Sequence, residues 1–579
     1  MPQDDARLSA LSRSMPAGLA GKVLAARGQV EGERKVVTIL FVDMVNSTGL
    51  AERLDPEEYA EIVNGSHRRV AQQVYRYEGI IAQLLGDGVL CFFGAPVSHE
   101  DDPERAVHAA LGIIEACQAY TAELARRQVA FHVRIGIHTG LVIVDKISTG
   151  QQLQYFADGS TISLASQLQS HADPDTILIS QNTFHSIEPL FDTVERDALT
   201  IPGRSASVCA YQVRGVKPGG VKRRGLPGVS SPMVGRQREL ATLVQFAENL
   251  RRGQGGIVAV IGEAGLGKSR LIAEWEQWVR ASADEGVSPL SWAEGRARSY
   301  GVTMGYHLII DLARSLLGVP SVLDRQDLQA ALQSRLHALF AEDSALYAEG
   351  YPYMAHLLGL LLEPPWAERL QYVDPQTLQT QYALAIHRAF RTLTAIAPTV
   401  IVLDDVHWAD AQSVDLIRRL LPLVADRPLL LCLAMRPENT APAWKLLGEA
   451  RDLPGVGLTE LYLTALSSTD SESLVTNLLG RGDLPVSLHD LILSRAEGNP
   501  FFVEEVIRIL IDRGILQPVD GEWVSAETAG QIAIPDTLKG LLMARIDQLP
   551  EDVRHTLRVA SVLGREFSFQ LLLKVLQEK

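Results

Sequence analysis

A glycine-rich segment near the middle of the chain has the residue types that hold a phosphate chain. Gly262 is followed after four residues by Gly267, Lys268 and Ser269, directly after the apolar run 257–261. Glycines let backbone N–H groups converge on phosphate oxygens because no Cβ blocks the approach. The lysine supplies charge for the β- and γ-phosphates, the serine offers a hydroxyl to Mg²⁺, and the following helix presents its positive N-terminus. These residues predict a nucleoside triphosphate site.

A second segment fits the same chemistry. The apolar run 400–403 ends in two carboxylates, Asp404 and Asp405. We expect Asp404 to hold Mg²⁺ through water, and Asp405 to orient or deprotonate the attacking water. The alternative is a glycine-rich turn and an unrelated buried strand. Because both segments occur in the required order, the sequence favours the phosphate site.

Two further aspartates lie in the first part of the chain. Asp43 ends the apolar run 36–42, and Asp87 lies between two glycines in the predicted hairpin 80–94. Brought together, the two carboxylates would hold two Mg²⁺ ions, an arrangement suited to in-line attack on an α-phosphate. From spacing alone, each is better explained as an ordinary strand-end or turn aspartate.

The segments around these aspartates alternate between strand and helix patterns. Asp55, Pro56 and Glu58 predict a helix start with a capping box. An apolar stripe at helical spacing follows, formed by Tyr59, Ile62, Val63, Val70 and Val74. Another helix is expected from residue 102, and 131–144 predicts a second hairpin that turns at Thr139 and Gly140. The alternation predicts an α+β domain of about 180 residues.

Composition narrows the class of protein. The 579 residues carry 54 Lys and Arg against 69 Asp and Glu, a formal net charge of −15, which argues against a general nucleic-acid binder. No apolar run reaches membrane-spanning length and the N-terminus is polar, so we expect a cytoplasmic protein with no membrane partner. The four cysteines lie far apart, without the spacing of a disulfide framework or zinc site.

The second half of the chain resembles the signal-transduction ATPases with numerous domains, which are related to AAA+ and NACHT proteins. The stretches that carry the resemblance follow the family order over about 350 residues. They are the phosphate loop with PMVGRQREL (232–240), VLDDVHWAD (402–410), LAMRPE (433–438), GNPFFVEEV (498–506) and IPDTLKGLLMARIDQLP (534–550). The resemblance implies that ATP is bound by the loop, with Gly265 among its glycines.

The same resemblance assigns roles outside the loop. Val234 and Arg236 would lie near the adenine, and Pro500 of a lid domain would contact the base from its other side. Arg436 matches a γ-phosphate sensor at a strand end. The alternative for Arg436 is a surface residue that caps the strand.

The first half resembles a class III adenylyl/guanylyl cyclase homology domain. The matching stretches are GERKVVTILFVDMVNST (32–48), EGIIAQLLGDGVLCFFG (78–94), VRIGIHTG (133–140) and GSTISLASQL (159–168). Asp43 and Asp87 match the two metal-binding aspartates of that family, and the resemblance implies Mg²⁺ or Mn²⁺ there.

Four other positions depart from the cyclase pattern. Gln83 and Phe156 replace the two base-recognising residues, Ser163 replaces the ribose-orienting Asn, and Gln167 replaces the transition-state Arg. Losing one preorganised transition-state donor typically costs ~10²–10³ in rate. In that family one domain supplies the aspartates and its partner supplies the other residues, so a homodimer of this chain would lack a complete site. Two interpretations fit: the metal-bearing half of a heterodimer, or a non-catalytic regulatory dimer that binds nucleotide or metal.

Together these features predict a multidomain chain that becomes wholly helical from about residue 460. The expected parts are a lead-in (1–33), an α+β ferredoxin-like cyclase domain (34–215), a linker (216–230), an α/β P-loop ATPase core (231–458), a helical lid (459–533) and the start of a winged-helix unit (534–579) that is apparently truncated. Our main hypothesis is a signal-transduction protein in which an ATP-hydrolysing switch acts on a cyclase-type domain. The alternatives are an active adenylate cyclase that makes cyclic AMP, and an ATP-dependent transcriptional regulator, which is disfavoured because 536–579 shows no basic recognition face.

Overall fold

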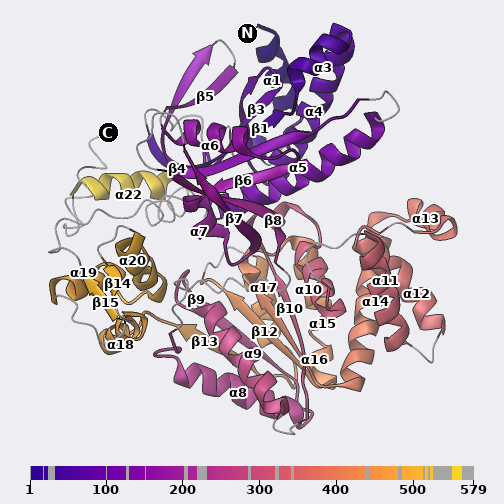
Figure 1. Ribbon diagram of the computed structural model, residues 1–579. Coiled ribbons are helices and arrows are strands. Elements are labelled where there is room, and N and C mark those ends of the chain that lie inside the picture. Colours follow the sequence, from indigo (N-terminus) through magenta and orange to yellow (C-terminus); the bar gives the residue numbers. More distant parts are fainter. Residues whose placement is uncertain are drawn as a thin grey trace. The chain divides into compact units, whose positions relative to one another are not determined.

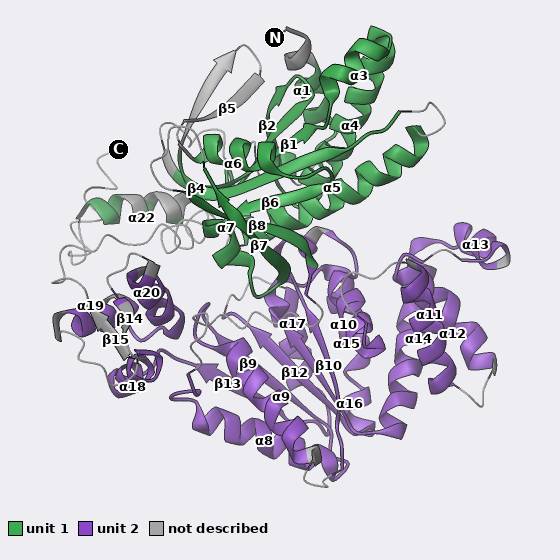
Figure 2. Cartoon of the chain, in the orientation of Figure 1, with its two compact units in different colours: residues 1–215, 533–579 green, residues 216–532 purple. Residues whose placement is uncertain are grey.

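The chain forms two compact units, one of residues 1–215 with 533–579 and one of residues 216–532 (Figure 2). Their elements are labelled in Figure 1. The computed structural model describes residues 2–16, 19–21, 23, 33–99, 101–124, 129–149, 152–158, 160–200, 207–217, 231–284, 288–319, 325–340, 344–360, 362–437, 442–479, 486–512, 516–519, 522–525, 551–563 and 575. The predicted linker therefore lies almost wholly outside the described residues. Of the predicted winged-helix unit, only residue 575 and the helix α22 (Glu551–Leu563) are described.

The first unit is built on a βαββαβ arrangement. Its strands lie in the order β2-β3-β1-β4, which is the ferredoxin-like order, and all three of these pairings are antiparallel. The elements are β1 (Glu33–Met44), α4 (Pro56–Arg76), β2 (Ile80–Leu85), β3 (Gly88–Phe93), α5 (Asp102–Leu124) and β4 (Val133–Thr149). This arrangement confirms the predicted α+β class.

The remaining elements extend this sheet and cover it. Strand β4 also pairs antiparallel with β5 and parallel with β6, and β8 and β7 follow beyond β6. Helix α6 packs against β4 and β1, and α1 packs against β2. Their bounds are α1 (Pro2–Arg13), α3 (Ser47–Arg53), β5 (Gln152–Asp158), α6 (Ser160–His171), β6 (Thr176–Ser180), α7 (Gln181–Ile187), β7 (Phe191–Leu199) and β8 (Val208–Val216).

The prediction of a hairpin over 131–144 is wrong, because this segment is one continuous strand, β4. The glycines of β4 do not form a turn; they leave room for helix α6. A Cβ on Gly136 would lie 2.2 Å from the carbonyl oxygen of Ala165 and from the backbone nitrogen of Gln169. A Cβ on Gly140 would lie 3.0 Å from the side chain of Thr161. The glycines therefore let α6 approach the strand closely, and the hairpin partner of β4 is β5.

The first predicted helix and hairpin are correct, with one exception in the capping. Helix α4 begins at Pro56 and buries most of its predicted apolar stripe, whereas Tyr59 stays partly exposed. Asp55 occupies the N-cap position, but its side chain makes no capping hydrogen bond, so the capping box is wrong. Strands β2 and β3 pair antiparallel around Gly86 and Asp87, as predicted.

The second unit is an α/β domain around a parallel sheet. Its five strands lie in the order β10-β11-β12-β9-β13, and every pairing is parallel. The strands are β9 (Gly256–Gly262), β10 (Ser291–Arg296), β11 (Thr399–Asp404), β12 (Leu429–Met435) and β13 (Leu458–Leu463). Because the strands are parallel, their carboxyl ends share one edge of the sheet, where ligands bind in such folds.

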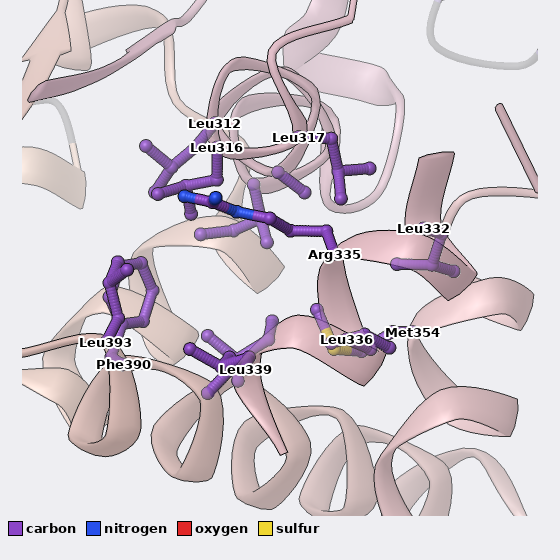
Figure 3. A pocket seen from close by; sticks show the side chains of 14 residues that line it. Leu312, Leu316, Leu317, Leu332, Arg335, Leu336, Leu339, Met354, Phe390 and Leu393 are labelled. Atoms are coloured by element: carbon purple, nitrogen blue, oxygen red, sulfur yellow. The ribbon is translucent and has the colours of Figure 1, made fainter. Parts of the chain in front are cut away.

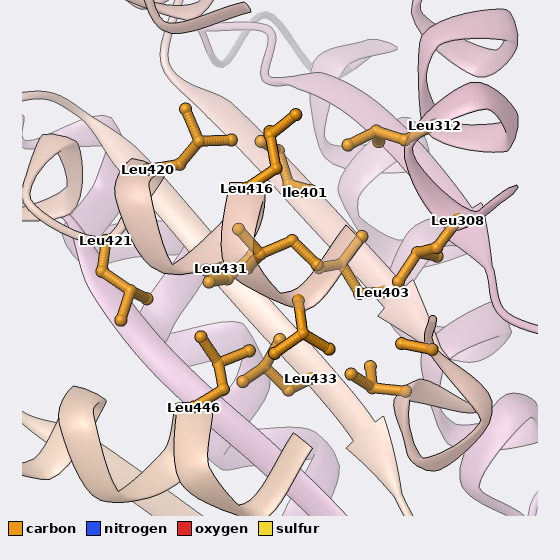
Figure 4. Packing of buried hydrophobic residues seen from close by; sticks show 14 of the residues in the cluster. Leu308, Leu312, Ile401, Leu403, Leu416, Leu420, Leu421, Leu431, Leu433 and Leu446 are labelled. Carbon is orange, nitrogen blue, oxygen red and sulfur yellow. The ribbon is translucent and has the colours of Figure 1, made fainter. Parts of the chain in front are cut away.

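Apolar layers cover both faces of this sheet. Helices α8 (Gln237–Arg251) and α9 (Lys268–Asp284) pack on one face through residues that include Leu243 and Trp275. Figure 4 shows the opposite layer, in which leucines of the strands meet leucines of the covering helices. Those helices are α10 (His307–Leu317), α14 (Pro375–Ile396), α15 (Ala411–Leu420), α16 (Leu423–Asp426) and α17 (Pro442–Arg451).

A helical insertion follows α10. Helices α11 (Arg325–Leu339), α12 (Ser344–Leu357) and α13 (Pro364–Gln371) precede α14, and a cavity of about 60 Å³ lies among α10, α11, α12 and α14. Figure 3 shows the Arg335 side chain extending across this otherwise apolar space. The cavity is smaller than the ~150 Å³ that holds a benzene molecule, so we regard it as a packing gap.

The prediction of wholly helical structure from about residue 460 is wrong. Strand β13 pairs with β9 at the edge of the sheet, and β14 (Leu516–Val519) pairs with β15 (Glu522–Ser525). The sequence pattern does not predict strand β13, because this strand is half-exposed and has no continuous apolar run. Three helices with their own apolar cluster follow it, α18 (Ser468–Leu479), α19 (Val486–Ala496) and α20 (Pro500–Asp512). They occupy the place of the predicted lid and are called the lid below, although the role of a lid stays a prediction. Among the described residues, no helix is both long and apolar enough to span a bilayer.

Candidate nucleotide and metal sites

The predicted phosphate loop joins β9 to α9 at the carboxyl edge of the parallel sheet. Gly265 and Gly267 have φ values of +82° and +92°, a backbone region that favours glycine. Lys268 is 7% exposed, and its Nζ donates to the carbonyl oxygens of Gly262 at 2.7 Å and Glu263 at 3.1 Å. Burial lowers the pKa of Lys268, an effect partly offset by the Asp405 carboxylate. The ammonium therefore lies inside the loop, where it would meet phosphate oxygens.

The predicted Mg²⁺ residues lie next to each other. Ser269 Oγ donates to Asp404 Oδ2 at 3.0 Å, although the two residues are 135 positions apart. Asp404 is 2% exposed, and burial together with the neighbouring Asp405 raises its pKa. One hydroxyl and one carboxylate suit Mg²⁺, which takes its remaining ligands from water and phosphate. These residues fit the ion.

Asp405 adopts an unusual backbone conformation. Its φ is 55°, in the left-handed region that is uncommon for a non-glycine residue and concentrated at functional sites. Its backbone N–H donates to Asp404 Oδ1 at 2.9 Å. The Asp404 carboxylate is therefore fixed by the backbone of the residue that follows it.

Arg296, which we did not predict, holds this pair of carboxylates. It ends β10, in register with Asp404 on β11. Its Nη2 donates to Asp405 Oδ2 at 3.0 Å and lies 3.7 Å from Asp404 Oδ2. Burial alone would raise the pKa of Asp405, but the positive charge of the neighbouring Arg296, with a smaller contribution from Lys268, holds this pKa below its ordinary value. The sequence signal was a basic residue at a strand end (SWAEGR), but nothing linked it to a site 109 residues away.

Arg436 directly follows β12, next to the loop strand β9. It is 8% exposed, so it is not the surface residue of the alternative interpretation. Its guanidinium lies 5.9 Å from the centre of the Trp408 ring, and its charge contributes to lowering the pKa of Lys268. It therefore lies near the expected phosphates, and its role as a γ-phosphate sensor stays a prediction.

The lid contacts the loop through the residues around Pro500. Asn499 Nδ2 donates to the carbonyl oxygen of Ala264 at 3.1 Å, and the Phe501 backbone N–H donates to that of Gly265 at 3.4 Å. A Cβ on Gly265 would lie 2.6 Å from Asn499 Oδ1. Pro500 itself begins α20. The contact of this turn with a nucleotide stays a prediction, and the sequence did not predict that the Asn499 side chain contacts the loop.

The predicted adenine residues also connect the loop to the lid. Arg236 Nη2 donates to the carbonyl oxygens of Leu266 at 3.3 Å and of Thr464, just after β13, at 2.5 Å. Val234 packs against the apolar cluster of the lid. Arg236 therefore lies beside the loop and Val234 beside the lid, and the contact of both residues with adenine stays a prediction.

In the first unit, Asp43 and Asp87 come together as their strands require. Asp43 lies near the end of β1, and a Cβ on Gly88 would lie 3.5 Å from Asp43 Oδ1. Burial and the nearby Asp87 raise the pKa of Asp43. Asp87 Oδ2 is buried and accepts no hydrogen bond within the described part of the chain. Two close carboxylates, one with an unsatisfied oxygen, fit a divalent cation.

Two residues that we did not predict contact Asp43. Arg134 Nη2 lies 3.3 Å from Asp43 Oδ2, and Gln169 Nε2 donates to the same oxygen at 3.1 Å. Arg134 is directly opposite Asp43 in the β1–β4 register, and Gln169 belongs to α6. The sequence signal for Arg134 was its place in VRIGIHTG, but the wrong hairpin over that segment hid the pairing.

The four departures from the cyclase pattern fall on three elements. Ser163 and Gln167 are four residues apart on α6, the first exposed and the second half-exposed. Gln83 is exposed on β2. Phe156 belongs to β5, and its side chain lies outside the described part of the structure.

Comparison with known families accounts for both units. The family "Adenylate and Guanylate cyclase catalytic domain" matches residues 30–215, and the family "AAA ATPase domain" matches residues 232–432. The chain joins a nucleotide cyclase homology domain to an AAA-type ATPase domain. A domain of unknown function matches residues 467–522, which cover α18, α19, α20 and β14.

Individual relatives include two proteins of Rhizobium meliloti. An uncharacterized protein is 26% identical over 550 residues, which cover 94% of this chain and 50% of the relative. Adenylate cyclase 1 is 30% identical over 186 residues, which cover 32% of this chain and 28% of the relative. The chain thus spans half or less of the length of both relatives. Among solved structures, the adenylyl cyclase CyaB from P. aeruginosa is 26% identical over 32% of this chain and 96% of its own, with a TM-score of 0.31.

Proposed function

We propose that this protein is a signalling protein in which the AAA-type domain binds and hydrolyses ATP, and its nucleotide state controls the output of the cyclase domain. The observation that carries the ATPase part is the cluster of Lys268, Ser269, Asp404 and Asp405 at one sheet edge. These residues come from two segments, the start of α9 and the end of β11, which lie about 135 positions apart in the sequence and which the fold brings together.

In the proposed reaction, each residue of the cluster has a separate task. Lys268 exchanges its loop carbonyl oxygens for oxygens of the β- and γ-phosphates. Ser269 and Asp404 hold Mg²⁺, which when bound neutralises phosphate charge. Asp405, kept ionised by Arg296, orients the attacking water or accepts its proton. Arg436 meets the charge that develops on the γ-phosphate.

The route from the ATP site to the lid runs through hydrogen bonds. Asn499 binds the loop from the lid side, and Arg236 bridges Leu266 of the loop to Thr464 at the start of the lid. A phosphate that shifts the loop would therefore change the partners of both residues. This supports a lid position that depends on the bound nucleotide.

The ATPase proposal is tested by ATP binding to the full chain. Lys268→Ala should abolish measurable binding of a fluorescent ATP analogue, because the buried ammonium is lost. Arg280→Ala, which removes an exposed arginine from the same helix, should bind like wild type. Equal ATP affinity of Lys268→Ala and wild type would refute the proposal.

A second candidate function is adenylate cyclase activity, favoured by the unsatisfied Asp87 Oδ2 beside Asp43. Because this chain lacks the other half of the family's site, we expect product only when a complementary cyclase domain supplies it. The test is cyclic AMP formation from ATP and Mn²⁺, by the chain alone and with candidate partner domains, compared with Asp43→Ala. Product from the chain alone that disappears in Asp43→Ala would show that Gln83, Phe156, Ser163 and Gln167 do not prevent catalysis.

A further inference from the structure

Arg296 places a fixed positive charge beside the atoms expected to hold the metal ion. Asp404 Oδ2 accepts a hydrogen bond from Ser269 Oγ at 3.0 Å and lies 3.7 Å from Arg296 Nη2. The same Nη2 is 3.0 Å from Asp405 Oδ2. The guanidinium therefore contacts both carboxylates of the pair, on the side where the phosphate loop also approaches.

The backbone around Arg296 is anchored. Its N–H donates to Asp311 Oδ2 at 2.8 Å, and the N–H of Ala297 donates to the Asp404 carbonyl oxygen at 3.0 Å. Strand β10 pairs with β11 along its whole length, and Arg296 is the last residue of the pairing. The guanidinium is thus held near the carboxylates by the sheet itself.

The position of the Arg296 guanidinium affects the charge balance of the site. Asp404 is buried and Asp405 is partly buried. Two such neighbouring carboxylates repel each other, and one cation that contacts both relieves the repulsion. A divalent ion that enters the same place meets the guanidinium, and like charges about 4 Å apart repel strongly in a buried site. The phosphates of a nucleotide bring the negative charge that offsets this repulsion.

We propose that Arg296 is a built-in counter-ion that holds the Asp404–Asp405 pair in the empty site, so that the metal ion enters with the phosphates of the nucleotide and not before them. The proposal rests on the ATP site proposed above and adds an order of binding to it. A purely supporting role for Arg296 predicts the opposite effect of its removal, because disordered carboxylates would bind metal more weakly.

The test is a titration of nucleotide-free full chain with Mn²⁺ alone, followed by electron paramagnetic resonance of the free ion. All proteins carry Asp43→Asn, so that the cyclase aspartates contribute little. Arg296→Gln should bind Mn²⁺ at least about tenfold more tightly than its parent. Arg296→Lys, which keeps the charge, and Arg280→Gln, an exposed control, should stay within about threefold of the parent.

Equal or weaker Mn²⁺ binding by Arg296→Gln would overturn the proposal. If that variant does not fold, the comparison is made between Asp405→Asn and Asp405→Asn with Arg296→Gln, which lose one and two charges. The double variant should again bind Mn²⁺ about tenfold more tightly, and equal binding overturns the proposal. The titration contains no ATP, so its outcome is independent of whether Lys268→Ala loses nucleotide binding.

Discussion

The two pairs of aspartates in this protein have different surroundings. Asp404 and Asp405 lie among cations and a hydroxyl from the same chain, supplied by Arg296, Lys268 and Ser269. Asp43 and Asp87 have Arg134 and Gln169 on one carboxylate, while an oxygen of the other accepts no hydrogen bond in the described residues. The first pair therefore has cationic or hydroxyl partners on both carboxylates, whereas the second pair keeps one buried carboxylate oxygen without a hydrogen bond from the described residues.

The largest expected effect is on the rate of ATP hydrolysis when Asp405, of the Asp404–Asp405 pair, is replaced. Asp405→Asn keeps the size of the side chain but removes the proposed base, and should lower the ATP hydrolysis rate at least about 100-fold. Its affinity for an ATP analogue should change little, because Lys268 and the loop remain. Asp452→Asn, an exposed aspartate of the same unit, is the control. Undiminished hydrolysis by Asp405→Asn would place the base elsewhere.

A smaller effect is expected at Glu294, whose ionisation would add a negative charge near Asp404 and Asp405. Burial, and next the charge of Asp404, raise the pKa of Glu294 from its ordinary 4.5 to about 7. The folded protein therefore holds this proton to a higher pH than the unfolded chain does, so wild type loses stability as the pH rises from about 4.5 to about 7. Glu294→Gln cannot ionise, so relative to wild type it should gain about 3 kcal/mol in free energy of unfolding across that window.

The measurement is urea unfolding of both proteins at pH 5 and pH 8. Glu449→Gln removes an exposed glutamate from a surface ion pair and should show no such change between the two pH values. The same stability difference between Glu294→Gln and wild type at both pH values would show that Glu294 titrates normally.

The smallest effect concerns the surroundings of Asp43, in the Asp43–Asp87 pair. A Cβ on Gly136 would collide with the backbone of α6, the helix that carries Gln169 to Asp43. Gly136→Ala should lower the free energy of unfolding by about 1–3 kcal/mol. Gly215→Ala has open space around it and should be close to neutral. Thermal unfolding of the two variants checks this, and equal stability would mean that α6 lies farther from β4.

Residues that define a site within one short segment were predictable from the sequence. The phosphate loop, the strand that ends at Asp404, and the hairpin around Asp87 each carry their own pattern of glycines, apolar runs and carboxylates. Residues that reach a site from other strands and helices could not be predicted, because no local sequence pattern indicates which carboxylate they contact. Arg296, Arg134 and Gln169 reach their carboxylates only through strand register or helix packing.

Two errors in the fold have a common cause. The sequence predicts a turn at Thr139 and Gly140, yet the glycine is needed there because α6 lies against β4, a contact that only the tertiary structure reveals. Strand β13 lacks a continuous apolar run because it is an edge strand. In both cases the environment of the residue, and not its intrinsic preference, decided its conformation.

Strand β13 also fixes where the lid can pivot. Its last pair joins Leu463 to Gly262, the first glycine of the phosphate loop, and the carbonyl oxygen of Thr464 is already bound to Arg236. Four residues after Thr464, helix α18 begins at Ser468. The lid helices are therefore tied to the phosphate loop twice, through the chain that leaves β13 beside Gly262 and through Asn499 at the start of α20. Inserting residues between Thr464 and Ser468 would lengthen the hinge while leaving the ATP site intact.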